Sequence, residues 1–145
     1  MLVNQILSMK ASGEIFTVGP ETSVAEATRL LSEKRIGAIV VSEDGKIPLG
    51  ILSERDVVRE LGKRGAAVLE QPITELMTRK LATCTTGEDA LVILDRMTQG
   101  RFRHLPVVDE RGEMVGIVSI GDAVSARLKE LAAEKEALTG MIMGN

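Results

Sequence analysis

The chain contains no tryptophan, no tyrosine and only two phenylalanines among its 145 residues. It therefore lacks the series of aromatic side chains on which nucleic-acid bases stack, and its formal net charge of −3 offers no basic field to a phosphate backbone. A single cysteine, Cys84, excludes an internal disulfide and a multi-cysteine zinc site. No apolar run approaches the roughly 20 residues of a membrane-spanning helix. These absences argue against nucleic acid and membrane as main partners and predict a cytoplasmic protein.

The composition that remains is that of a globular domain. Hydrophobic residues make up 44% and charged residues 27% of the chain, which is too apolar for a disordered protein. A chain of this length can build a real core, whereas half of it would be marginal alone.

One seven-residue pattern occurs twice. GILSERD, from Gly50 to Asp56, returns as GIVSIGD, from Gly116 to Asp122. An apolar run precedes each copy, at residues 38–41 and 104–108. Self-similarity at a fixed spacing indicates an internal duplication, and the two copies are expected to bury their apolar faces against each other.

The duplication can be aligned residue by residue. Val41 is matched with Val108 and Gly45 with Gly112, so equivalent residues are 67 apart. The spacing falls to 66 where Gly50 is matched with Gly116. One extra residue is therefore expected in the first turn, near Pro48. Further upstream, the helical stripe of Val24, Ala27 and Leu30 is matched with Leu91, Leu94 and Met97.

Periodicity and turn signals predict the same order of elements in both halves. Ser23 to Glu26 forms a capping box, and Asp44-Gly45 suits a hairpin turn. Helices are predicted at 3–9, 24–34, from 54 until Gly62, 75–78, 88–99 behind a Thr86 cap, and 121–138. Strands are predicted at 15–18, 38–41, 49–52, 81–84, 105–108 and 115–118, with a linker at 62–67.

The last predicted helix carries an apolar stripe at heptad-like steps, interrupted by Lys135. Its members are Val124, Leu128, Leu131, Leu138 and Ile142. Such a stripe either covers the protein's own core or pairs with another subunit.

In its paired motifs the chain resembles the CBS-domain family, as a tandem pair of the stand-alone bacterial type often called a Bateman module. The resemblance rests on 5–8 and 75–78 at the head of each half, 36–41 and 103–108 in the middle, and the two G-x-x-S-x-x-D endings. It implies an α+β fold of two pseudo-symmetric β-α-β-β-α repeats packed sheet to sheet, with an extended C-terminal helix. The repeats are placed at 1–66 and 67–128, and the helical tail at 129–145.

The resemblance also implies binding of adenosine nucleotides, with AMP most expected and ATP, ADP or NAD(H) as alternatives. The motif chemistry agrees, because an ionised Asp accepts from two ribose hydroxyls and a Ser at a helix N-terminus can donate to a phosphate. Spacing alone would equally suit two helix caps without a ligand. The full set of expected nucleotide-binding residues is Ser53, Arg55, Asp56, Ser119, Asp122, Arg103, His104, Pro106, Ile15, Thr17, Ile39, Ala82 and Cys84. In that set, backbone near Ile15–Thr17 and Ala82–Cys84 would read the adenine edge, and Ile39 or Pro106 its face.

The two expected sites differ in charge. Arg55 stands where the second motif has Gly121, and Arg101, Arg103 and His104 precede the second strand pair, so different affinities or ligands are expected. His104, the only histidine, has no nucleophile or carboxylate at a recognisable catalytic spacing, and no metal site is indicated. Together with the resemblance, which implies a homodimeric regulatory module acting on an unidentified partner protein, these observations predict a non-enzymatic protein. The alternative is a dimeric CBS adaptor that binds no ligand.

Overall fold

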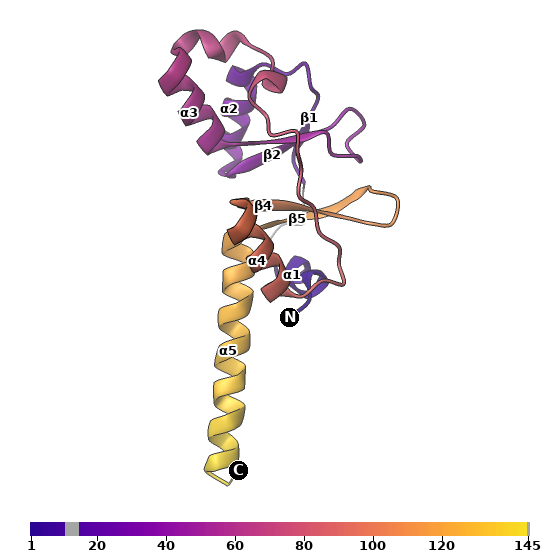
Figure 1. Ribbon diagram of the computed structural model, residues 1–145, viewed down its shortest axis with the longest axis vertical. Coiled ribbons are helices and arrows are strands. Elements are labelled where there is room, and N and C mark those ends of the chain that lie inside the picture. The colour runs from indigo at the N-terminus through magenta and orange to yellow at the C-terminus, as the bar shows by residue number, and fades with distance from the viewer. Residues whose placement is uncertain (11–14, 145) are drawn as a thin grey trace.

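The molecule is built in layers, with two small sheets between two sets of helices (Figure 1). This computed structural model describes residues 1–10 and 15–144. One long helix leaves the body and carries the C-terminus away from it. The architecture is the expected mixed helix-and-strand fold with its C-terminal helix.

The first half forms a three-stranded sheet in the order β1-β2-β3, with β1 parallel to β2 and β3 antiparallel to it. Gly45 takes a φ of +77° in the β2–β3 turn, as the Asp-Gly pair predicts. In chain order the elements are α1 (Val3–Met9), β1 (Thr17–Val18), α2 (Val24–Lys34), β2 (Ala38–Val41), β3 (Gly50–Ser53) and α3 (Glu54–Arg64). Two 3₁₀ helices follow, η1 (Ala66–Glu70) and η2 (Ile73–Glu75).

The second half contains α4 (Ala90–Gly100), β4 (His104–Val108), β5 (Met114–Ser119) and α5 (Ile120–Ile142). Strands β4 and β5 are antiparallel. The predicted strand at 81–84 is reduced to one parallel bridge between Cys84 and Val107. That bridge occupies the place that β1 holds in the first half.

Several predicted boundaries need correction. Helix α3 does not stop at Gly62 but runs to Arg64, because Gly65 with its φ of +76° ends it. Residues 66–70 are 3₁₀ helix rather than plain linker. Helix α4 is capped by Asp89, which accepts from the Leu91 N–H, and not by Thr86.

The spacing between the halves is 66 residues in the helices and strands, not 67. Val41 pairs with Gly50 as Val107 pairs with Gly116, so Val107 is its equivalent. Both hairpins have the same number of residues between these pairs, so the extra residue expected near Pro48 is not found, and the register shift between Val107 and Val108 only changes the pairing within the second hairpin. The buried positions of α4 are accordingly Ala90, Ile93 and Met97, whereas Leu91 is exposed.

Each half completes its core with the leading segment of the other half. Val3 and Ile6 of α1 are buried in the core of the second half, beside Ile93 and Leu105. Reciprocally, Ile73 and the residues Leu76 and Met77 lie in the core of the first half. Backbone bonds hold these exchanged segments, among them Val3 N–H to the Glu88 carbonyl at 2.9 Å and Ile73 N–H to the Thr22 carbonyl at 2.8 Å. The boundary between the repeats at residue 66 therefore remains a prediction about the sequence. The two cores do not divide at that residue, since each contains a segment of the other half.

Helix α5 packs on α4 through its first turns and then projects alone (Figure 1). Ala123 and Ala126 are buried, but residues 131–139 are all exposed. The apolar stripe that the sequence shows is thus mostly uncovered, with Leu128 62% and Leu138 59% exposed. None of the described helices is long and apolar enough to cross a membrane.

Candidate functional site

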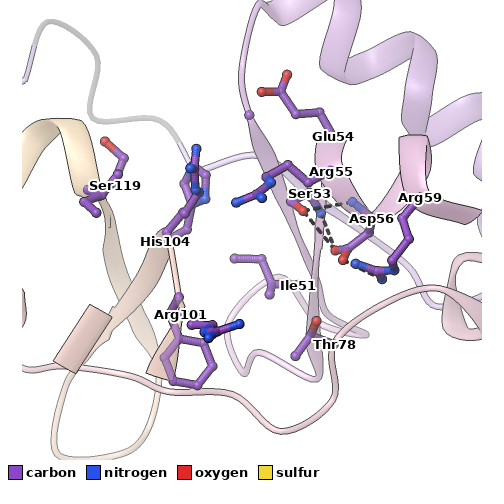
Figure 2. Close-up of a pocket in the computed structure, with 14 residues that line it drawn as sticks. Ile51, Ser53, Glu54, Arg55, Asp56, Arg59, Thr78, Arg101, His104 and Ser119 are labelled. Carbon is purple, nitrogen blue, oxygen red and sulfur yellow. Dashed lines mark hydrogen bonds and ion pairs between the residues drawn. The ribbon is translucent and has the colours of Figure 1, made fainter. Parts of the chain in front are cut away.

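Two cavities lie between the halves, and each combines one Ser-x-x-Asp motif with the segment before the first hairpin strand of the other half. Cavity 1, of about 610 Å³, contains Ser53 and Asp56 of the first motif. Facing them are residues 101–104, which lead into β4, and Thr78. Figure 2 shows Arg55, His104, Arg101 and Thr78 arranged around this space.

Cavity 2, of about 420 Å³, reverses the arrangement. It contains Ser119 and Asp122 of the second motif together with residues 35–38, which lead into β2. Ile15 and Phe16, just before β1, also line it. His104, Gly37 and Ser119 belong to both cavities, so the two spaces adjoin.

Asp56 is held tightly at the start of α3. Its Oδ2 accepts from the Ser53 N–H at 2.9 Å and the Ser53 hydroxyl at 3.0 Å, while the Asp56 N–H donates to Ser53 Oγ. Its Oδ1 accepts from Arg59 Nη2 at 3.0 Å (Figure 2). Only 7% of the residue is exposed. The capping interpretation is therefore correct, and the cap at Oδ2 together with the Arg59 contact at Oδ1 engages both carboxylate oxygens.

Asp122 makes the same box at the start of α5, but with a different cation. Its Oδ2 accepts from the Ser119 N–H at 2.9 Å and lies 3.0 Å from Lys10 Nζ. Lys10 follows α1 and also donates to the Ile117 carbonyl. Burial alone would raise the pKa of Asp122, yet the Ser119 hydrogen bond and the Lys10 ammonium outweigh it and hold that pKa below its usual range.

His104 stands between the cavities, with its ring against Gly37. A Cβ on Gly37 would lie 3.4 Å from both Cε1 and Nε2 of His104. Burial lowers the pKa of His104, and the nearby Asp122 carboxylate opposes this only in part. The imidazole is therefore neutral at pH 7 and suits a hydrogen-bonding role better than a phosphate charge partner.

The motif glycines serve packing rather than a ligand. A Cβ on Gly50 would lie 2.6 Å from Met77 Sδ and 3.0 Å from the Thr78 carbonyl oxygen. On Gly116 it would lie 2.7 Å from a methyl carbon of Leu7. Each glycine thus lets the exchanged leading segment of the other half approach its strand closely.

The structure brings eight of the thirteen expected residues to a cavity. They are Ser53, Arg55, Asp56, Arg103, His104 and Ser119 in cavity 1, with Ile15 and Asp122 in cavity 2. His104 and Ser119 also line cavity 2.

The other five expected residues line neither cavity. Ile39 is fully buried in the core of the first half, because alternation along β2 turns its neighbours Ala38 and Val40 toward cavity 2. Cys84 is likewise a core residue, and burial raises the pKa of its thiol to about 12. Pro106, Thr17 and Ala82 complete this group.

Sequence reasoning missed several cavity residues as ligand candidates. Arg59 was detectable, since it lies three residues after Asp56 and therefore on the same face of α3. Lys10, Phe16 and Arg35 gave no signal, because only the packing of the two halves brings them to Asp122. Among the described residues there is no cluster of three His, Cys, Asp or Glu side chains that could hold a metal ion.

Comparison with known proteins identifies the family and the fold. The CBS domain profile matches residues 4–63 and again 73–129. A protein of Acidianus ambivalens, described as an uncharacterized 17.7 kDa protein in the bps2 3' region, is 32% identical over 84% of this chain and 73% of its own. The mitochondrial CBS domain-containing protein CBSX3 of Arabidopsis thaliana is 33% identical over 92% of this chain, which spans 66% of that protein.

Solved structures show the same arrangement. The CBS-domain containing protein ATU1752 of Agrobacterium tumefaciens has a TM-score of 0.82 at 40% identity, over 88% of this chain and 99% of that one. The protein PAE2072 of Pyrobaculum aerophilum, solved with AMP, has a TM-score of 0.77 at 26% identity over 92% and 99%. The CBS domain pair of protein MJ0100, with 5′-methylthioadenosine and S-adenosyl-L-methionine, gives 0.75 at 26% over 88% and 98%.

The chain belongs to the CBS-domain family, as a tandem pair of CBS domains. Proteins of this family are in general regulatory rather than catalytic, and structural neighbours of this chain bind AMP or ligands related to S-adenosylmethionine.

Proposed function

We propose that this protein is a sensor that binds adenosine nucleotides, AMP foremost, in the two cavities between its repeats and reports occupancy to a partner protein. The observation that supports it is the paired geometry: each cavity contains a Ser and an Asp at a helix N-terminus, facing residues of the other repeat. ADP, ATP and NAD(H) share the adenosine part and remain alternatives. We further propose a cytoplasmic homodimer without catalytic activity.

The cavities provide complementary chemistry for such a ligand. Carboxylates accept from ribose hydroxyls, and the N-termini of α3 and α5 favour phosphate. A ligand in either cavity touches both repeats, so it can shift the angle between them. It does so only to the extent that it binds one arrangement better than the other.

A thermal-shift panel tests this proposal. AMP, ADP, ATP, NAD⁺, NADH, S-adenosylmethionine and GMP are each added near 1 mM and unfolding is followed with a dye, since the chain has no Trp or Tyr. A ligand at 100 times its Kd adds about 2.7 kcal/mol, which raises the Tm of a chain this size by several degrees. We expect a rise with adenosine compounds and none with GMP. No rise with any of them would contradict the proposal.

A second candidate is an adaptor that assembles without a ligand, and the exposed stripe on α5 favours it. Val124, Leu128, Leu131 and Leu138 are each more than 40% exposed and share one face at heptad-like spacing. Uncovered apolar stripes of this kind commonly mark a protein interface.

Truncation after Lys129 tests whether the exposed stripe on α5 joins subunits. If the stripe joins subunits, the truncated protein should contain fewer subunits per particle by light scattering, while keeping its fold by circular dichroism. The control is Glu136→Gln, an exposed α5 position outside the stripe. An unchanged number of subunits after truncation would show that residues 130–145 do not hold the subunits together.

A further inference from the structure

The two cavities differ in the cations that face them. Cavity 1 is lined by four arginines, Arg55 and Arg59 from α3 and Arg101 and Arg103 from the segment before β4. Cavity 2 has only Arg35 and Lys10. Lys10 is already paired with Asp122, at 3.0 Å.

Three of the cavity 1 arginines have no carboxylate partner within the described part of the chain. Arg59 pairs with Asp56, but Arg55, Arg101 and Arg103 form no ion pair there. Arg55 and Arg101 enter from different repeats and point into the same space (Figure 2). Unpaired guanidinium groups that converge on a concave surface suit a ligand with several anionic oxygens, because each can bind phosphate through two parallel N–H bonds.

The two aspartates that would accept from a ribose also differ, because fewer of the carboxylate oxygens are already bonded in cavity 2. Both oxygens of Asp56 are engaged, Oδ2 by Ser53 and Oδ1 by Arg59. In Asp122 the Ser119 amide and Lys10 both bind Oδ2. A ribose diol therefore meets a less occupied carboxylate in cavity 2, whereas phosphates meet more free cations in cavity 1.

From this asymmetry, and resting on the proposed function, we infer that cavity 1 selects adenosine nucleotides with two or more phosphates, while cavity 2 takes the monophosphate. The larger volume of cavity 1, about 610 against 420 Å³, accommodates the longer chain of phosphates. Arg101 and Arg103 act as specificity residues that recognise the phosphates beyond the first. Because Arg55 belongs to the other repeat, a bound polyphosphate joins the two repeats.

The test isolates each cavity by removing the aspartate of the other. ATP and AMP are titrated calorimetrically, without divalent metal ions, into Asp122→Ala protein for cavity 1 and Asp56→Ala protein for cavity 2. We expect ATP to bind at least tenfold more tightly than AMP in cavity 1, and less than threefold more tightly in cavity 2. The same ratio in both cavities would overturn the inference and leave the proposed function standing.

Two substitutions then assign the effect to residues. Arg101→Gln with Arg103→Gln, in the Asp122→Ala protein, should weaken ATP binding by tenfold or more and AMP binding by less than threefold, since a lost charge-assisted bond has about that effect. The control Arg29→Gln removes one positive charge from the exposed surface of α2, outside both cavities. If Arg29→Gln weakens ATP binding as much, the effect is general charge and the inference fails.

Folding and the nature of the ligand need separate controls. The ligand-free Tm shows whether the double variant folds, and Arg101→Lys, which keeps the charge but loses the guanidinium fork, gives a milder substitution with an intermediate loss of ATP affinity. Inorganic tripolyphosphate is titrated as well. If it binds cavity 1 in an Arg101- and Arg103-dependent way while no adenosine compound binds, the proposed function fails and the phosphate selectivity stands. If neither binds, both fail.

Discussion

Asp122→Ala is expected to weaken AMP binding in cavity 2 by about ten- to hundredfold, and Asp56→Ala to do the same for a nucleotide in cavity 1. Removing one partner of a charge-assisted hydrogen bond costs about 1.5–3 kcal/mol, and 1.4 kcal/mol is tenfold in Kd. Calorimetry should find one remaining site in each single variant and none in the double variant. The effect is large because an ionised carboxylate can accept hydrogen bonds from both hydroxyls of a ribose.

These aspartates also close the capping boxes of α3 and α5. A control variant must therefore remove a helix cap whose side chain does not line a cavity. Asp89→Ala does so, because Asp89 caps α4 and lines neither cavity. We expect it to lower the free energy of unfolding by about 0.5–2 kcal/mol and to leave nucleotide binding unchanged. Wild-type affinity in the Asp56→Ala/Asp122→Ala double variant would show that the ribose is not bound by these side chains.

Ile73→Ala is expected to lower the free energy of unfolding by about 2–5 kcal/mol, the range for large-to-small substitutions in a packed core. Ile73 begins the second CBS match, yet its side chain is fully buried in the core of the first half. Denaturant unfolding followed by circular dichroism measures the change. The matched control is Ile142→Ala, since Ile142 on α5 is 77% exposed and should change stability little.

A loss below about 1 kcal/mol for Ile73→Ala would mean that the leading segment of the second repeat is only loosely docked. The expected large loss would also appear in one cooperative transition rather than two. The reason is that each half contains a buried segment of the other, so neither can unfold alone.

Much of the fold follows from local sequence. The Ser23 cap, the Asp44-Gly45 turn and the repeated Gly50–Asp56 pattern each depend on neighbouring residues, and the structure has all three. The 67-residue spacing was wrong for the helices and strands before Gly50, because a one-residue shift in a helix leaves an apolar stripe that looks equally periodic. Only burial distinguishes Ala90 and Ile93 from Leu91 and Leu94.

The site residues likewise divide into those that a local motif predicts and those that only the packing brings together. Ser53, Asp56, Ser119 and Asp122 could be predicted because a motif of seven residues contains them. The groups opposite them could not, because Lys10 reaches Asp122 from 112 residues away in sequence, through the packing of α1 on the other half. Ile39 was misplaced for a related reason: all four residues of β2 are apolar and buried, so the sequence does not say which face borders a cavity.

The exchange of leading segments has a consequence for the origin of the protein. A gene for one repeat would encode a chain whose leading segment cannot pack in its own core. Two such chains would fold only by exchanging these segments, so that each segment packs in the core of the other chain. Their stability would depend on protomer concentration, as in any obligate dimer. Joining two copies in one chain, through the stretch around Gly65, removes that dependence. It also lets the two cavities, which would be identical in a symmetric ancestor, acquire different arginines.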